Sequence, residues 1–393
     1  MKPIYLDYAA TSPVDPRVQR AVAIAMELDW GNPSSLHEEG RRARQALDEA
    51  RERVASFLGA DHYSQILFTS GGTEANQLAI QGAVRARRKE GRSRLLVSAV
   101  EHPSVLEAAR ALKGEGIQVE VIPVDGEGRI RLDALQGLLD RQVALVAVMA
   151  ANNETGALQP VEEVVALAHR EGAWVHCDGV QMAGQLPFSV SRWGVDFLSV
   201  SSHKMYGPKG MGALYVAAGK RLSPLFFGGG QERAWRPGTE NVPGAVGFGE
   251  ACLLAQSFLD GGGHEQVRTL RRQLEERLLE AIPGARVHGL KDESLRHPGL
   301  LNIAFPWVRG ESFLLALDMA GIYCSTGSAC TAGSLEPSHV LMAMGVSEEE
   351  AGRSFRFSIG RQTTPEEIGR AAEAVAQAWQ DQVERLRRRE VMR

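Results

Sequence analysis

The chain has 393 residues, a length that fits two domains better than one small module. Hydrophobic residues make up 44% of the sequence and charged residues 23%, which excludes both intrinsic disorder and collagen-like order. The formal net charge of −4 provides no basic field, so we expect no direct nucleic-acid binding.

The cysteines and the N-terminal residues indicate the cellular compartment. Only four cysteines occur and no two form a CxxC pair, so the sequence supports neither a disulfide framework nor a zinc ribbon. The first residues lack the apolar core of a signal peptide, and no apolar run has the length of a membrane span. We therefore expect a reduced, cytoplasmic protein that does not enter a membrane.

Helical and strand patterns alternate from about residue 15 to residue 255. Asp15 and Pro16 provide an N-cap and a first helical position for an amphipathic helix to about residue 28, and a longer charged helix covers about 36–58. Short β-rich runs, several nearly all apolar, follow at 65–69, 94–100, 118–123, 143–149, 174–177, 197–200 and 213–216. Helical patterns separate most of them, at 74–88, 105–112 and 161–171. This alternation predicts an α/β fold with a mostly parallel central sheet sandwiched by helices.

The composition changes in the second half of the chain. Residues 227–239 are rich in glycine and polar residues, which predicts a loop, and Gly261-Gly262-Gly263 marks a second break. A charged helix is expected at 266–281 and a long one at about 365–389. We therefore predict a large α/β domain of residues 15–261 and a smaller α+β domain formed by residues 1–14 and 262–393.

Lys204 lies in the segment SSHKMYGPKG (residues 201–210), directly after an apolar strand pattern. Most lysines are solvated surface charges. Two hydroxyls and an imidazole precede this one, however, and that setting suits a buried amine that forms a Schiff base beside a phosphate group.

Two further segments follow predicted strands. The sequence SGGTE (residues 70–74) opens a helix, where free backbone N–H groups and the helix dipole favour an anion. Many such loops, however, contain two glycines without binding an anion.

Asp178 ends an apolar strand, where a carboxylate needs a partner such as a pyridinium N–H. His176 and Asp178 share a strand face, so a metal pair is conceivable, but no third ligand lies nearby. Cys177 points to the opposite face and is expected in the core.

Cys330 lies in CSTGSACTAGS (residues 324–334), a run of small and polar residues without periodicity. Cysteines are usually buried, so a cysteine on such a loop suits a reactive thiol, although an accidental loop thiol has the same pattern. Cys324 and Cys252 are expected to be structural. A disulfide between Cys324 and Cys330 is disfavoured in a reducing compartment.

Taken together and in order, these segments resemble the cysteine desulfurases, pyridoxal-phosphate (PLP) enzymes of the class V aminotransferase group. The resemblance extends from YLDYAAT (residues 5–11) to RFSIGR (residues 356–361). It implies the fold type I of PLP-dependent transferases and a small C-terminal domain that carries the cysteine loop at about 324–335. It also implies removal of sulfur from L-cysteine, with release of L-alanine.

The resemblance also implies roles for individual residues. Lys204 matches the lysine that holds PLP, Cys330 the nucleophile, and Thr239 a phosphate contact supplied by the partner subunit of a homodimer. Asn153 and Arg356 match substrate contacts, with Arg356 on the α-carboxylate, as suits a planar two-donor fork. The remaining matches surround the cofactor: Gly72, Thr73, Ser201 and His203 at the phosphate, Asn153 and Gln181 at the ring hydroxyl, Asp178 at the ring nitrogen and His102 stacked on the ring.

The implied reaction uses these groups in sequence. Cysteine displaces Lys204, the protonated ring accepts the electrons of the substrate Cα, and the Cys330 thiolate attacks the substrate sulfur. The resulting persulfide passes to an iron–sulfur scaffold or another acceptor protein, for iron–sulfur assembly, tRNA thiolation or both. Thiolate formation needs a lowered pKa or a nearby base, for which His102 is the candidate.

Some positions depart from the commonest family pattern. Gln231 replaces a frequent histidine, Gly-Gly-Thr replaces Gly-Ala-Thr, and the cysteine loop contains small-for-small changes. The RxGHHC pattern of the other main branch is absent, so selenocysteine cleavage is a side reaction at most. Two alternatives remain open: another PLP enzyme of this fold, which would not need Cys330, and a catalytically silent partner that only docks scaffold proteins.

Overall fold

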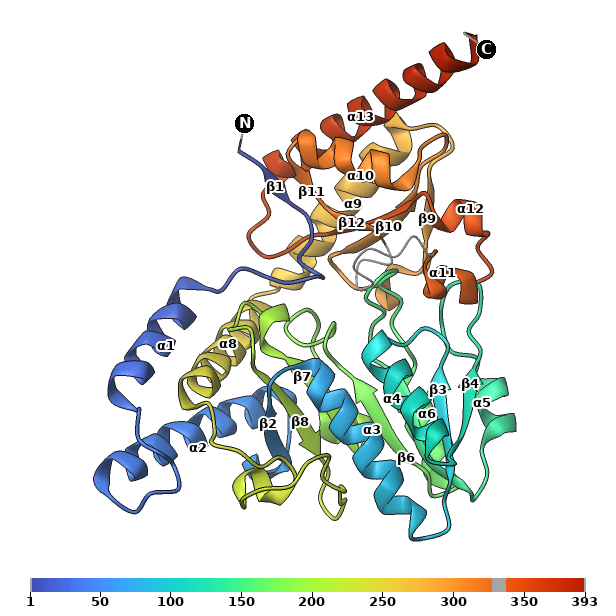
Figure 1. Cartoon of the computed structure of the whole chain (residues 1–393). Helices are drawn as coiled ribbons and strands as arrows, with labels where there is room; N and C mark the ends of the chain where they lie inside the picture. The colour runs from blue at the N-terminus through green and yellow to red at the C-terminus, as the bar shows by residue number, and fades with distance from the viewer. Residues whose placement is uncertain (1, 327–336, 392–393) are drawn as a thin grey trace.

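The computed structural model describes residues 2–326 and 337–391, so Cys330 lies outside the described residues. Seven strands form the central sheet in the order β2-β8-β7-β6-β5-β3-β4 (Figure 1). Their bounds are β2 (Ile66–Thr69), β3 (Arg94–Ser98), β4 (Gln118–Ile122), β5 (Val143–Met149), β6 (Trp174–Asp178), β7 (Phe197–Ser201) and β8 (Gly212–Val216). Strand β8 is antiparallel to both of its neighbours, and all other pairs are parallel. The predicted α/β class and its seven strand runs are confirmed, with each end displaced by two residues or fewer.

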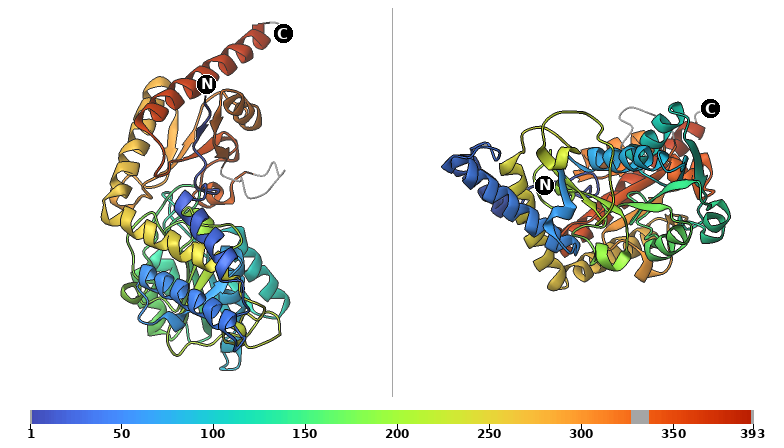
Figure 2. Two further views of the ribbon diagram at one scale, coloured as in Figure 1. Left: turned by 90° about the vertical axis from the view of Figure 1, so that its left-hand side faces the viewer. Right: turned by 90° about the horizontal axis from the view of Figure 1, so that it is seen from below.

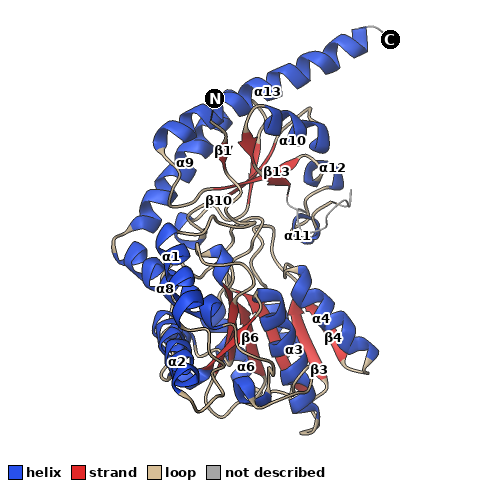
Figure 3. Cartoon of the chain, turned by 60° about the vertical axis from the view of Figure 1, so that its left-hand side comes forward, coloured by secondary structure: helices blue, strands red, loops and turns tan. Residues whose placement is uncertain are grey.

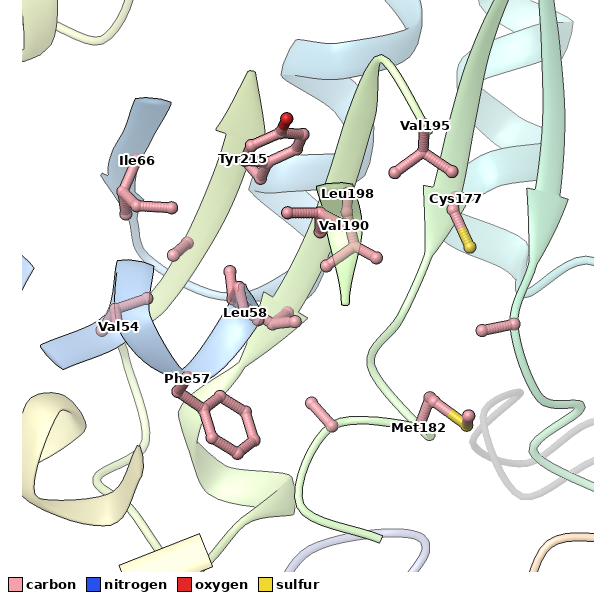
Figure 4. Packing of buried hydrophobic residues seen from close by; sticks show 14 of the residues in the cluster. Val54, Phe57, Leu58, Ile66, Cys177, Met182, Val190, Val195, Leu198 and Tyr215 are labelled. Carbon is pink, nitrogen blue, oxygen red and sulfur yellow. The ribbon is translucent and has the colours of Figure 1, made fainter. Parts of the chain in front are cut away.

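Helices cover both faces of this sheet (Figure 3). On one face lie α2 (Glu38–Leu58), α6 (Val161–Arg170) and α8 (Val242–Asp260); on the other lie α3 (Gly72–Arg88) and α4 (Pro103–Gly114). Because successive strand residues point to opposite faces, Val146 packs in the first layer and Leu145 in the second. Figure 4 shows part of the first layer, in which Cys177 contributes to the core as expected. The sheet therefore has a buried layer on each side, and its strand ends are left to build a site.

Shorter elements complete the first two thirds of the chain. Helix α1 (Pro16–Leu28) begins as predicted, with the Asp15 side chain accepting a hydrogen bond from the backbone N–H of Arg17. The other short elements are α5 (Leu132–Leu138), α7 (Val190–Trp193) and the 3-10 turns η1 (Tyr63–Gln65), η2 (Ser202–Lys204) and η3 (Gln231–Ala234). Turn η2 places Lys204 directly after the end of β7.

The C-terminal third forms a second layered unit around an antiparallel sheet, in the order β12-β13-β10-β9. Its strands are β9 (Arg286–His288), β10 (Leu300–Ala304), β12 (Ser325–Thr326) and β13 (Ser354–Ser358), and a separate parallel pair joins β1 (Ile4–Tyr5) to β11 (Ile322–Tyr323). The helices are α9 (Gly263–Ala281), α10 (Gly310–Met319), α11 (His339–Ala343), α12 (Glu348–Ala351) and α13 (Pro365–Val391), with the turn η4 (Glu293–Leu295). The end of α13 extends beyond the other elements (Figure 2).

The first residues of the chain pack into this C-terminal unit. Ile4 and Leu6 belong to the same apolar cluster as Phe305, Phe313 and Phe355, together with residues of α9 and α13. The exact domain limits at residues 14/15 and 261/262 stay a prediction.

Helix α8 differs from the expectation that no apolar run reaches membrane-span length. Within the described residues it is long and apolar enough to cross a membrane, with a mean hydropathy of 1.3, and 56% of that stretch is buried inside the protein. Its aliphatic, aromatic and alanine side chains raise the mean hydropathy. Its glycines allow close packing, with Gly247 against Val22 of α1 and Gly249 against Ala50 of α2. Phe248 and Cys252 of α8 lie in the core cluster, which is the position of a core helix.

The predicted loop at 227–239 is confirmed, and a buried ion pair fastens it to the sheet. Both carboxylate oxygens of Glu232 accept hydrogen bonds from Arg51 of α2 at 2.7 Å, and Oε2 also accepts from the backbone N–H of Phe68 at 3.0 Å. The Gln231 side chain accepts a hydrogen bond from the backbone N–H of Gly238 at 3.2 Å. These contacts join η3 to α2 and β2 and to Gly238, the residue directly before Thr239.

We predict that Glu232→Ala lowers the free energy of unfolding by about 3–5 kcal/mol, because Arg51 would then be a buried charge without its partner. The measurement is urea denaturation. The control is Glu107→Ala, which removes the exposed ion pair with Arg110 and should cost less than about 1 kcal/mol. The double replacement Arg51→Met/Glu232→Leu should lose less than Glu232→Ala; an equal or greater loss would contradict the role given to the charge.

Candidate active site

A cavity of about 360 Å³ lies at the carboxyl ends of the parallel strands, next to Arg356 of the C-terminal sheet. Ligands of open α/β sheets bind at this edge. The cavity brings together ten of the twelve residues that the sequence singled out: Gly72, Thr73, His102, Asn153, Asp178, Gln181, Ser201, His203, Lys204 and Arg356. Thr239 lies instead in a neighbouring cavity of about 200 Å³ with Ser70 and Arg236, and Cys330 is outside the described residues.

Lys204 is turned inward. Its Nζ donates hydrogen bonds to the backbone carbonyls of Ala9 and Ala10, the second at 2.9 Å, and the side chain lines the cavity. Lys204 is therefore not a solvated surface charge, although most lysines are. The amine therefore faces the space in which a ligand carbonyl would sit.

Asp178 presents a buried carboxylate at the end of the central strand β6. Its Oδ1 accepts a hydrogen bond from the backbone N–H of Val180 at 3.0 Å, and its Oδ2 accepts one from Nδ2 of Asn76 at 2.7 Å. The residue is 6% exposed and lines the cavity. A cationic N–H of a ligand would pair with it, because a buried carboxylate is stabilised by charge-assisted hydrogen bonds.

Another part of the cavity, where α3 begins, carries groups that can bind an anion. Helix α3 begins at Gly72 and Thr73, which gives free backbone N–H groups and the positive end of the helix dipole. Ser201 Oγ is buried and has no hydrogen-bond partner among the described residues. His203 contacts Thr11 Oγ1 at 3.1 Å, and burial with the charges of Lys204 and Lys209 lowers its pKa to about 4. A phosphate group fits this set of donors.

His102 lies at the N-terminus of α4 and lines the same cavity. Its Nδ1 accepts a hydrogen bond from the backbone N–H of Ser104 at 3.1 Å and lies 2.8 Å from Ser104 Oγ. Burial lowers the pKa of His102, and Lys204 and His339 lower it further, whereas Asp178 acts in the opposite direction. The imidazole is therefore neutral near pH 7.

Arg356 comes from β13 and is 2% exposed. Its guanidinium donates to the backbone carbonyl of Asn153 at 3.0 Å and to Oδ1 of Asp7 at 2.9 Å. Its Nε has no partner among the described residues. A planar cation held in this way can receive a carboxylate at the edge of the cavity.

Three residues of the site escaped the sequence reasoning: Asn76, Ser104 and Asp7. Asn76 lies on the buried face of α3, where a polar side chain among apolar neighbours was the available signal. Asp7 lies within the segment that carried the family resemblance, but its partner Arg356 is 349 residues away, and no local pattern shows such a pair.

The conceivable metal pair of His176 and Asp178 gains no support. The described residues contain no group of three or more side chains that could hold a metal ion. His176 is fully buried, contacts Ser199 Oγ at 3.0 Å, and has its pKa lowered to about 4 by burial. Its place is in the core behind Asp178.

Comparison with known proteins agrees with this geometry. The family model "Aminotransferase class-V" matches residues 4–370. The chain is 44% identical over 368 residues to "Cysteine desulfurase" of Klebsiella pneumoniae, covering 94% of this chain and 90% of that one. It is 44% identical over 377 residues to "Cysteine desulfurase NifS" of Azotobacter vinelandii, covering 95% and 92%.

Solved structures are similar over the same length. A "NIFS-LIKE PROTEIN" has a TM-score of 0.88 at 36% identity and covers 95% of this chain and 98% of its own. "SspA in complex with cysteine" has a TM-score of 0.79 at 32% identity, with coverages of 92% and 99%.

Glu154, beside the cavity, gives a prediction about pH. Burial raises its pKa from 4.5 to about 7, against the opposing effects of Ser338, which donates to its carboxylate, and Arg356. The folded protein thus retains a proton that the unfolded chain loses, so this group makes stability fall as pH rises from about 4.5 to 7. As pH rises from 4.5 to 7, the free energy of unfolding of Glu154→Gln should therefore increase by about 3 kcal/mol relative to that of the wild type. Urea denaturation at pH 4.5 and pH 8 measures the difference, and parallel profiles for the two proteins would contradict it.

Proposed function

Since this chain belongs to the class V aminotransferase family and, within it, to the cysteine desulfurases, we propose that it binds PLP and removes sulfur from L-cysteine, releasing L-alanine. The sequence resemblance and the type I transferase fold are confirmed. The observation that carries the proposal is the meeting of an inward-facing lysine, a buried carboxylate and a buried arginine at one cavity, from Lys204, Asp178 and Arg356.

The residues of the cavity fit PLP at each of its polar groups. The start of α3 and Ser201 Oγ, which has no partner within the described part of the chain, suit the phosphate. Asp178 suits the ring nitrogen, and the Lys204 amine would hold the aldehyde carbon. When bound, PLP would supply an electron sink that acidifies the substrate Cα–H, and the Lys204 amine, which lines the cavity, would move the proton at that carbon.

Other residues bind and orient the substrate and cofactor. Arg356 holds the substrate α-carboxylate, with Asn153 beside it. Gln181, whose Nε2 donates to the backbone carbonyl of Ala9 at 3.0 Å, would contact the ring hydroxyl. His102 would cover the ring.

The sulfur acceptor in the first transfer is Cys330. Its thiolate forms a bond to the substrate sulfur while the Cβ–S bond of the substrate breaks, and the substrate carbon keeps the electron pair and takes up a proton on the way to alanine. Strand β12 supports this role, because Ser325 is the register partner of Arg356. Cys330 follows Thr326 by four residues, a reach of roughly 14 Å at most.

The persulfide of Cys330 then passes to an acceptor protein, an iron–sulfur scaffold or a protein of tRNA thiolation. The enzyme acts in the cytoplasm as a homodimer in which Thr239 reaches the phosphate of the partner's cofactor. The position of Thr239 outside the 360 Å³ cavity of its own chain supports this assignment.

Replacing the nucleophile tests the reaction. Cys330→Ala should lower the formation of alanine from L-cysteine, and of the sulfide that an added dithiol reductant releases from the persulfide, by roughly 1,000-fold or more, because no other thiol receives the sulfur. Cys324→Ala is the matched control, since burial raises the pKa of the Cys324 thiol and makes it a poor nucleophile. Full activity in Cys330→Ala would eliminate the desulfurase assignment in favour of another PLP reaction.

Replacing the lysine tests the cofactor. Purified Lys204→Ala should lack the visible absorbance band of covalently held PLP while keeping the fold, as measured by absorbance and circular dichroism. The nearby Lys209→Ala, which alters an exposed lysine, should keep the band. Absence of the band from the wild-type protein supplied with PLP would instead indicate a silent docking protein.

A further inference from the structure

The first turn of α4 determines which nitrogen of His102 carries the proton. The backbone N–H of Ser104 donates to Nδ1 at 3.1 Å, and a backbone N–H can only donate. Nδ1 must therefore present a lone pair, as the N-cap acceptor of the helix. In a neutral imidazole the proton is then on Nε2.

We propose that α4 holds His102 as a neutral imidazole with its proton on Nε2, so that His102 meets the cofactor and substrate as a hydrogen-bond donor, with Ser104 and Asn76 as the positioning residues. Nε2 has no hydrogen-bond partner among the described residues, and the ring lines the cavity. The tautomer depends only on the contacts of α4, whereas its use in catalysis rests on the proposed function.

With Nδ1 as the acceptor of the Ser104 backbone N–H, the other hydrogen bonds behind His102 take one set of directions. The Asp178 carboxylate can only accept, so the Asn76 amide donates to it at 2.7 Å. The same amide nitrogen donates its second hydrogen to Ser104 Oγ at 2.9 Å. Ser104 Oγ then uses its own proton toward His102 Nδ1, 2.8 Å away. The Asn76 amide thus connects Asp178, the proposed partner of the ring nitrogen, through Ser104 to the imidazole of His102.

The charges around His102 favour the neutral form. Asp178 of β6 favours protonation, whereas Lys204 of η2 and His339 of α11 oppose it, and burial opposes it most strongly. The positive end of the α4 dipole adds to this opposition. His339 is itself bonded through Nε2 to the backbone carbonyl of Glu101 at 3.0 Å.

This state narrows the role expected from the sequence, where His102 was the candidate base for a thiol. In the Nε2–H tautomer, Nε2 has no lone pair toward the cavity. Taking a proton there would require a proton to move to Nδ1 and the bond from Ser104 to break. A donor instead stabilises negative charge that develops on bound groups.

Solid-state 15N NMR of the holoenzyme labelled with 15N-histidine tests the tautomer directly, because neutral imidazole nitrogens with and without a proton have separate shifts. The His102→Gln spectrum identifies the His102 signals by subtraction. We expect Nε2–H and an unprotonated Nδ1 at pH 7 and at pH 8. An Nδ1–H form or an imidazolium at pH 7 would overturn the proposal. Because the spectrum requires no turnover, this result is independent of whether the chain desulfurates cysteine.

Replacing the positioning residue tests the connection to catalysis. Ser104→Ala keeps the backbone N–H but loses the hydroxyl, so kcat for alanine formation should fall about fivefold, the equivalent of one hydrogen bond of about 1 kcal/mol, with KM unchanged. Ser104→Thr restores the hydroxyl and should restore kcat. A wild-type kcat in Ser104→Ala, or a change confined to KM, would show that Ser104 does not position His102.

Discussion

The site depends on one buried carboxylate. Asp178 ends the central strand β6 and is almost entirely shielded from water, where an ion without partners costs several kcal/mol. The backbone N–H of Val180 and the amide of Asn76 offset part of this cost. The Asp178 carboxylate also faces the cavity, where a cationic group of a ligand can pair with it. Such a pairing explains why a charged side chain occupies this buried position.

The segment after β1 connects the two halves of the site. The carbonyls of Ala9 and Ala10 accept hydrogen bonds from Lys204, and Thr11 contacts His203, both on the side of the large sheet. Asp7, a few residues earlier, pairs with Arg356 of the C-terminal sheet. One short stretch of chain therefore sets the lysine and the arginine relative to each other. A shift of this segment would move Lys204 and Arg356 together, the residues proposed to hold the cofactor and the substrate carboxylate.

The sequence predicted the parallel sheet well, because buried strands are nearly continuous apolar runs and helical patterns separate most of them. It also predicted the main side chains at the strand ends, since a lysine or an aspartate there contrasts with its apolar neighbours. Asn76, Ser104 and the pair of Asp7 with Arg356 were missed because each depends on contacts between distant segments. The membrane-length apolar stretch of α8 was also missed, because Glu250 and Gln256 interrupt it and leave no continuous apolar run in the sequence. The structure brings ten of the site residues together at one cavity, but the roles of all twelve, including Cys330 and Thr239, stay predictions from the family resemblance.

Ring-nitrogen 15N NMR of the enzyme reconstituted with PLP labelled at that nitrogen tests the central claim about Asp178 most directly. The account predicts a protonated ring nitrogen at pH 8 in the wild type and an unprotonated one in Asp178→Asn, whose amide has the same shape but no charge. An unprotonated nitrogen in the wild type would mean that the buried carboxylate does not serve the ring, and would contradict the account.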